Sequence, residues 1–242
     1  MNAQSKQKEV KQKEPEQMKE KRSRGSVTRQ ALMRAAEKLI AREGLAGVSI
    51  RDIVTEAGQK NESALQYHFG NLKGLLAALH KMRDAEIQVI RSQMISEFEK
   101  ADAKPSLRDI CKLMVQPSFE LASSKADFRR YVKAFGQEVT LTDEHPMVLM
   151  RRKGGETAYQ VGNLLREAVS HLNESAFQRR LDGALRYISA AMYHEARRSN
   201  AFRGEEAQMF FSSLIDGLEG LLGAPESTET RTLRKKIENQ GK

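Results

Sequence analysis

Apolar residues recur along most of this 242-residue chain at the three- and four-residue spacing of amphipathic helices. The alternation of β-branched and polar residues that indicates strands is lacking. The pattern therefore predicts an all-α protein. The helices that it predicts cover about residues 28–43, 49–57, 61–67, 71–98, 106–123, 125–141, 146–171, 174–199 and 205–222.

Two short predicted helices lie on either side of a glycine turn between Ser49 and Phe69. Ser49 and Asp52 have the spacing of a capping box, in which a hydroxyl and a carboxylate satisfy free amides of the first helical turn. Gly58 is expected to end this helix in the left-handed conformation that glycine tolerates. A second short helix with a polar face follows from Asn61. This arrangement is typical of a helix-turn-helix motif, whose second helix reads DNA.

The motif belongs to a longer pattern between about residues 26 and 80. The pattern comprises the helix Thr28–Gly44, then Val48-Ser-Ile-Arg-Asp-Ile53, Ala57-Gly58, Tyr67-His-Phe-Gly-Asn71 and Leu75. In these residues the chain resembles the N-terminal domain of TetR/AcrR-type transcriptional regulators. It departs from the family pattern by one extra residue after Gly58, which widens the turn at Gln59 or Lys60. It also has Leu72, with Lys73 beside it, where a lysine is usual.

The resemblance implies a three-helix DNA-binding domain followed by a helical domain that binds a ligand and dimerises. We therefore expect the helix-turn-helix domain at residues 26–72 and the ligand-binding and dimerisation domain at 73–223. A long helix from Asn71 is expected to link them. The polar, charged segments 1–25 and 224–242 are expected to be disordered tails, because they have too few apolar residues to form a core.

The net charge of +9 is concentrated at the N-terminal end of the chain. Residues 1–82 contain 16 Lys or Arg and 9 Asp or Glu, whereas the remaining 160 residues contain 25 and 23. A basic head on a nearly neutral body is typical of a nucleic-acid-binding module attached to another domain. The basic tail itself is either a solubilising segment or an arm that follows phosphates or enters the minor groove.

Candidate DNA contacts come mainly from the second helix of the motif and the turn before it. Asn61 and Gln66 are suited to adenine edges and Glu62 to cytosine, although Asn61 is equally well explained as a helix cap. Tyr67 and His68 either bind phosphate or pack against the first helix. With phosphate contacts included, the candidate DNA-binding residues are Thr28, Ser49, Arg51, Gln59, Lys60, Asn61, Glu62, Ser63, Gln66, Tyr67, His68 and Lys73.

The resemblance also implies that the larger domain binds a small apolar or amphipathic effector, which releases a repressor from its operator. The weak candidates for ligand-binding residues are Tyr131, His145, Tyr159 and Tyr187, and none is singled out. The strongly apolar helix at 205–222 is either an internal core helix or part of a two-fold dimer seam. A homodimer would place two reading helices on a palindromic operator.

Other functional classes receive little support from the sequence. A glycine-rich phosphate loop, a nucleophile elbow and metal-ligand spacing are all lacking, so no enzyme activity, cofactor or metal site is expected. The single Cys111 is interpreted as a buried thiol rather than a redox sensor. Because no apolar run is long enough to cross a bilayer, we expect a cytoplasmic protein without a membrane partner. The alternative to a specific regulator is a non-specific DNA-binding, nucleoid-associated protein without ligand control.

Overall fold

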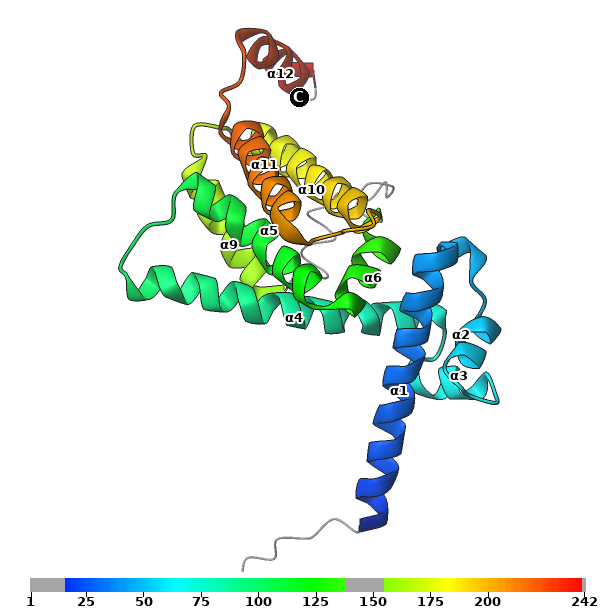
Figure 1. Cartoon of the computed structure of the whole chain (residues 1–242). Helices are drawn as coiled ribbons and strands as arrows, with labels where there is room; N and C mark the ends of the chain where they lie inside the picture. Colours follow the sequence, from blue (N-terminus) through cyan, green and yellow to red (C-terminus); the bar gives the residue numbers. More distant parts are fainter. Residues whose placement is uncertain (1–15, 138–154, 241–242) are drawn as a thin grey trace, which may run out of the picture.

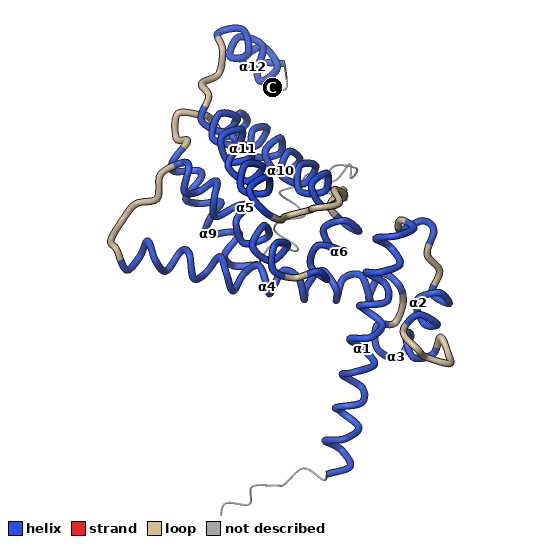
Figure 2. The backbone as a smooth tube through the Cα atoms, in the orientation of Figure 1, coloured by secondary structure: helices blue, strands red, loops and turns tan. Residues whose placement is uncertain are grey.

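The computed structural model of the chain describes residues 16–137 and 155–240 (Figure 1). Figure 2 shows helices joined by short connections, and no strand occurs within the described ranges, so the predicted all-α fold is confirmed. In chain order the helices are α1 (Glu16–Glu43), the 3-10 helix η1 (Leu45–Gly47), α2 (Ile50–Glu56), α3 (Ser63–Phe69), α4 (Leu72–Lys100), α5 (Leu107–Ser124), α6 (Ala126–Phe135), α9 (Gly155–Ala168), α10 (Glu174–Ala196), α11 (Gly204–Gly223) and α12 (Thr228–Gln240).

The helices α1, α2 and α3 and the first turns of α4 pack around one apolar cluster, and we call this unit the head. Leu32 and Ile53 are fully buried in it. The predicted capping box is present, since Ser49 Oγ accepts a hydrogen bond from the Asp52 amide at 3.2 Å and Asp52 Oδ2 accepts one from the Ser49 amide at 3.0 Å. Gly58 follows with φ 68°, in the left-handed region that glycine tolerates.

A single long helix, α4, connects the head to the rest of the chain. Asn71 Oδ1 accepts a hydrogen bond from the Gly74 amide at 2.9 Å, so Asn71 caps the helix as predicted. The helix then runs for 29 residues. Its first turns are buried in the head at Leu75 and Leu79, and Ile95 near its end is buried in a second apolar cluster. Figure 1 shows α4 extending from the head along the other helices.

The second cluster belongs to a larger unit, the body, formed by α5, α6, α9, α10, α11 and the second half of α4. Within it α5 contacts α4, α6, α9 and α11. Pro117 in α5 has no N–H, so the carbonyl of Leu113 lacks its helical donor. Arg91 of α4 donates from Nε to that carbonyl at 2.9 Å. A side chain from a neighbouring helix therefore replaces the missing backbone hydrogen bond.

Both ends of the described chain are helical where the sequence predicts disordered tails. α1 begins at Glu16 and not near residue 28, so the prediction for the tail 1–25 is wrong from residue 16 onward. α12 likewise occupies most of the second predicted tail, 224–242. Both segments are rich in Glu, Lys, Arg and Gln, which have high helix propensity even where apolar periodicity is weak.

The helix α6 is shorter than the sequence predicts. It ends at Phe135, whereas the apolar pattern extends to about residue 141. The next residue, Gly136, lies so close to α10 that an added Cβ would be 2.9 Å from Tyr193 Cβ. Its carbonyl also accepts a hydrogen bond from the Ser189 hydroxyl of α10. The chain is thus held by a tertiary contact at the end of α6. The predicted helix 146–171 is described only in its second part, as α9.

Candidate nucleic-acid interface

The helix α3 presents a polar face to solvent. Leu65 is only 1% exposed and anchors the helix in the core of the head, whereas Tyr67 is 83% exposed. Ser63 and Gln66 are exposed beside Tyr67, and Glu62 is exposed just before the helix. The second helix of the motif is therefore neither buried against the body nor extended, and its polar side chains are accessible to a ligand as large as DNA.

Two of the predicted DNA-binding residues are partly engaged within the turn before α3. Asn61 Oδ1 accepts a hydrogen bond from the Ser63 amide at 2.9 Å, but α3 begins at Ser63 with Glu62 at the N-cap position, so Asn61 orders the turn before the helix and is not itself the cap. Gln59 is half-buried, and its Nε2 donates to the Ala57 carbonyl at 3.3 Å. These contacts fix the shape of the turn and leave α3 itself to supply most of the free polar groups.

The two aromatic candidates at the end of α3 have different surroundings. Tyr67 projects into solvent. His68 is half-buried, and its Cε1 lies 3.7 Å from the position that a Cβ would take at Gly25, so its ring is close to α1. Phe69 packs against the core of the head, with the Arg29 guanidinium 5.0 Å above its ring. The structure therefore separates an exposed Tyr67 from a His68 that lies beside the first helix.

Candidate phosphate contacts surround α3. Arg51, Lys60 and Lys73 are all exposed. Thr28 lies within α1, which begins at Glu16, and not at the helix N-terminus that the sequence places at about residue 28. The Ser49 hydroxyl is engaged with Asp52 at the start of α2, and its hydrogen bonds hold the pKa of that carboxyl below the ordinary value.

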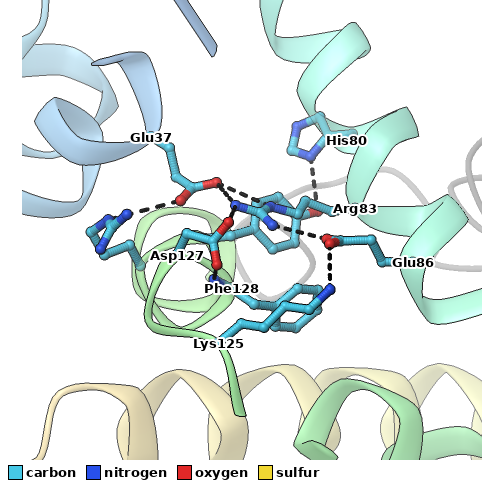
Figure 3. A network of polar contacts seen from close by, with 9 residues as sticks. Glu37, His80, Arg83, Glu86, Lys125, Asp127 and Phe128 are labelled. Atoms are coloured by element: carbon cyan, nitrogen blue, oxygen red, sulfur yellow. Dashed lines mark hydrogen bonds and ion pairs between the residues drawn. The ribbon is translucent and has the colours of Figure 1, made fainter. Parts of the chain in front are cut away.

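Arg83 is the centre of a buried polar network between head and body (Figure 3). Its guanidinium donates to Glu37 Oε2 from Nη2 at 2.6 Å and from Nε at 3.1 Å. It also donates to Glu86 from Nη1 at 2.8 Å and to Asp127 from Nη2 at 3.1 Å. Because Glu37 belongs to α1, Arg83 to α4 and Asp127 to α6, the network joins the head to the body.

Burial shapes the electrostatics of this network. It raises the pKa of Glu37 above its ordinary value, against the opposing effect of the hydrogen bond from Arg83. Burial also opposes the charge of Arg83, but hydrogen bonds to Glu86 and Glu37 outweigh it and raise the Arg83 pKa. Sequence reasoning missed the network, because Glu37 and Asp127 lie 46 and 44 residues from Arg83 and no local motif connects them.

The three candidate ligand-binding residues that the structure describes, Tyr131, Tyr159 and Tyr187, do not meet in one cavity. The Tyr131 hydroxyl lies 3.0 Å from His80 Nδ1, between α4 and α6. Tyr159 lines a cavity of about 440 Å³ between α5, α9 and α10. Tyr187 lies on α10 against Gly217 of α11. His145 lies outside the described residues.

Neither a metal centre nor a membrane span is found in the parts of the chain that the structure describes. No three His, Cys, Asp or Glu side chains of residues 16–137 and 155–240 are grouped closely enough to hold a metal ion. No helix in the same ranges is both long and apolar enough to cross a bilayer.

Comparisons with known proteins identify two matching family models. The model described as "Bacterial regulatory proteins, tetR family" matches residues 32–79, and the model described as "Tetracyclin repressor-like, C-terminal domain" matches residues 112–220. No curated protein matches the chain. A crystal structure described as a transcriptional regulator from Streptomyces coelicolor A3(2) is 18% identical over 81% of this chain and 99% of its own, with a TM-score of 0.40. The two models cover most of the head and most of the body, and the chain belongs to the TetR family of bacterial transcriptional regulators.

Proposed function

We propose that this regulator binds a specific palindromic operator as a homodimer and represses transcription until a small apolar or amphipathic ligand releases it. The exposed polar face of α3 is the observation that carries the DNA-reading step. Ser63, Gln66 and Tyr67 project from a helix that is anchored by the buried Leu65. A rigid helix of this kind fits the major groove and presents donors and acceptors to base edges.

Cations around α3 support the same role. Arg51, Lys60 and Lys73 are exposed near the reading helix, and none of them forms an ion pair with a carboxylate within the described part of the chain. Their charges are therefore available to phosphates, which position a protein on the duplex without reading its sequence. Binding of this type weakens as the salt concentration rises.

We assign the dimer seam to α10 and α11, which pack side by side on the outside of the body (Figure 1). Met209 on α11 is 69% exposed, and Tyr187 on α10 is also exposed. Gly183 and Gly220 have open space where a Cβ would stand. Two such helix pairs can form a four-helix bundle about a two-fold axis, with close approach at the glycines.

We propose that the ligand binds in the cavity lined by Met114 of α5 and by residues of α9 and α10. Its volume of about 440 Å³ lies within the range of about 300–1,000 Å³ that is usual for small-molecule sites. Phe177 and Leu181 supply apolar walls, while Asn163 and Gln178 supply polar groups. This composition suits an apolar or amphipathic molecule.

Release of the operator requires that the ligand bind more tightly to a conformation that does not bind DNA. The contact of α6 with α1, reinforced by the Arg83 network, supports a path from body to head. A small movement of α6 or α4 would change the orientation of the head. In a homodimer it would change the distance between the two copies of α3.

Selection of operator fragments from a random DNA pool tests the specific reading step. We expect enrichment of a palindromic sequence with two half-sites about one helical turn apart. We also expect its affinity advantage over random DNA to persist when the salt concentration is raised. Absence of any enriched sequence, with all affinity lost at raised salt, would instead support the non-specific alternative.

A single substitution on α3 tests whether Gln66 contacts a base. Gln66 is exposed, and its side chain makes no hydrogen bond to other described residues. Gln66→Ala is expected to weaken binding to the selected operator by about 1–3 kcal/mol while leaving thermal stability unchanged. Gln93→Ala, at an exposed position of α4, is the matched control and is expected to bind as the wild type does. Equal affinities for all three proteins would contradict base reading by Gln66.

A further inference from the structure

A small, strongly basic pocket lies between α6 and the connection from α10 to α11. Its volume is about 220 Å³. Arg129, Arg130, Lys133, Arg198 and Arg203 line it, and no acidic residue does so in the described part of the chain. The positive charges come from segments far apart in the sequence, so the fold and not a local charge run brings them together.

The charges in this pocket are only partly balanced. Lys133 and Arg203 have no carboxylate within 4.0 Å among the described residues. Arg129 donates from Nη1 to the Ala122 carbonyl at 2.7 Å, so neutral groups at the end of α5 hold it in place. Burial, followed by the positive charges of Arg203 and Arg130, lowers the Arg129 pKa. Like charges thus face one another without counter-charges in the pocket itself.

The two remaining cations have carboxylate partners outside the pocket lining. Arg198 pairs with Glu195 at 3.4 Å and with Glu206. Arg130 lies with its Nε 3.9 Å from Glu37 Oε1, an oxygen that is buried and has no hydrogen-bond partner. The contact is too long for a hydrogen bond, so Arg130 has donors to spare for a ligand.

An open groove of mixed polarity, lined by apolar side chains and by Arg42 and Gln137, adjoins the basic pocket. Lys133 lines both spaces. The groove has a volume of about 700 Å³ and passes between the end of α1, α6 and α10. Ile40 and Phe135 form part of its apolar wall, and Tyr193 and Arg197 lie at the α10 side. A molecule with an anionic group and an amphipathic body would fit the two adjoining spaces.

We propose that this basic pocket binds the phosphate or carboxylate group of a small organic anion, whose amphipathic remainder lies along the groove beyond Lys133. Duplex DNA is a poorer match. In Figure 1, α6 lies on the body side of α1, whereas α2 and α3 lie on its other side, so a duplex held by α3 would not face the pocket. The pocket is also distinct from the cavity between α5, α9 and α10, since they share no lining residue.

Arg130 gives the bound anion a route to the head. An anion in the pocket attracts the Arg130 guanidinium, whose Nε lies 3.9 Å from the Glu37 oxygen that has no hydrogen-bond partner. Glu37 lies on α1, beside Arg83 and Asp127 (Figure 3). Anion binding therefore changes the charge balance at the contact between α1 and α6. This second step rests on the proposed DNA-binding function, whereas binding of the anion does not.

The site is tested by isothermal titration calorimetry of the full-length protein. The three ligands are phenyl phosphate, benzoate and the uncharged benzyl alcohol. We expect the full-length protein to bind at least one anion and not the uncharged alcohol, and the two anions distinguish phosphate from carboxylate recognition. Lys133→Gln with Arg203→Gln removes the two cations that lack carboxylate partners and is expected to weaken binding at least tenfold. Lys100→Gln with Lys235→Gln removes the same charge from exposed positions elsewhere and is expected to leave it unchanged.

Circular dichroism and thermal melting establish that both double variants are folded. The proposal is overturned if neither anion binds the wild type, or if the two double variants lose affinity equally. It is also overturned if the Lys133/Arg203 variant loses affinity for random DNA while no small anion binds. If an anion binds as expected but leaves DNA affinity unchanged, the site stands and the step through Arg130 fails.

Discussion

Arg91 of α4 supplies a hydrogen-bond donor that α5 lacks because of Pro117. Pro117 removes the backbone donor that the Leu113 carbonyl would have in a regular helix, and Arg91 Nε takes its place at 2.9 Å. Arg91 Nη1 also lies 3.4 Å from Thr157 Oγ1, but no carboxylate is within 4.0 Å in the described residues. Burial lowers the pKa of Arg91, which means that keeping its charge in the core destabilises the folded state.

Arg91 and Pro117 are therefore expected to be coupled energetically. Arg91→Met should lower the free energy of unfolding by about 1–3 kcal/mol, because it leaves the buried Leu113 carbonyl unpaired. In a Pro117→Ala background the loss should be smaller, since the introduced alanine has a backbone amide that can donate to that carbonyl. Urea denaturation of the four proteins in a double-mutant cycle measures the coupling. Identical losses in both backgrounds would show that Arg91 does not replace the proline's missing donor.

The buried Cys111 thiol is expected to react very slowly with thiol reagents in the native protein. Burial raises its pKa to about 12, so the reactive thiolate is scarce at neutral pH. Because the folded-state pKa is raised, the associated stability is fully present below the ordinary pKa and is lost progressively as the pH rises from there through about 12. At about pH 8, a thiol reagent should react with the native protein only as fast as the protein opens. Rapid reaction with one thiol per chain would support a redox sensor instead.

At the scale of elements, the contact between head and body rests on a buried ion pair rather than on apolar packing alone. Glu37 is 1% exposed, and its partner Arg83 also contacts carboxylates from α4 itself and from α6. Removing one member of a buried pair leaves an unpaired charge, whereas replacing both with apolar residues removes the charges together. The pair therefore specifies which surfaces of α1, α4 and α6 face one another.

Substitutions at this pair are expected to be strongly non-additive. Arg83→Met should destabilise the protein by about 3–5 kcal/mol, because Glu37 remains buried without its partner. Adding Glu37→Leu should recover a large part of that loss. As a control, Lys38→Met breaks the exposed pair with Glu56 between α1 and α2 and should cost far less than Arg83→Met, because exposed ion pairs are screened by solvent. If denaturation shows that the losses at Arg83 and Glu37 simply add, the buried pair does not act as a unit.

Elements whose ends are set by local chemistry could be predicted from the sequence. The capping box at Ser49, the left-handed turn at Gly58 and the cap at Asn71 each depend on residues a few positions apart, and all three are present. The end of α6 could not be predicted, because Gly136 is held by contacts with α10. The start of α1 was missed for a different reason: a lysine- and glutamate-rich composition is compatible with both helix and disorder.

The same distinction applies to the candidate site. The polar face of α3 follows from helical spacing, so its exposed residues were predictable. The placement of Thr28 at a helix start was wrong, because local spacing did not show that α1 begins at Glu16. The Arg83 network and the basic pocket around Lys133 could not be predicted, since their members come together only when α6 packs against α1 and α10. Their residues carry no pattern that local spacing could reveal.

On the scale of the whole molecule, the head lies at one end of α4 and the proposed dimer seam lies on the outer face of α10 and α11 (Figure 1). One head reads only a few base pairs. Joining two heads through the body makes the second contact effectively intramolecular, which raises operator affinity without any new contact to a base. Dimerisation and specific DNA binding should therefore be lost together.

A charge introduced on α11 tests this dependence. Gly220 has open space around an added Cβ, so Gly220→Glu should fold as a monomer but oppose a like charge across the two-fold seam. Light scattering should give about twice the chain mass of 27.3 kDa for the wild type and the single chain mass for the variant. Operator affinity should fall at least tenfold, while Gln93→Glu, with the same charge on α4, should retain both mass and affinity. If Gly220→Glu remains dimeric with full operator affinity, the seam lies on another face, and the spacing of the two copies of α3 must be set there.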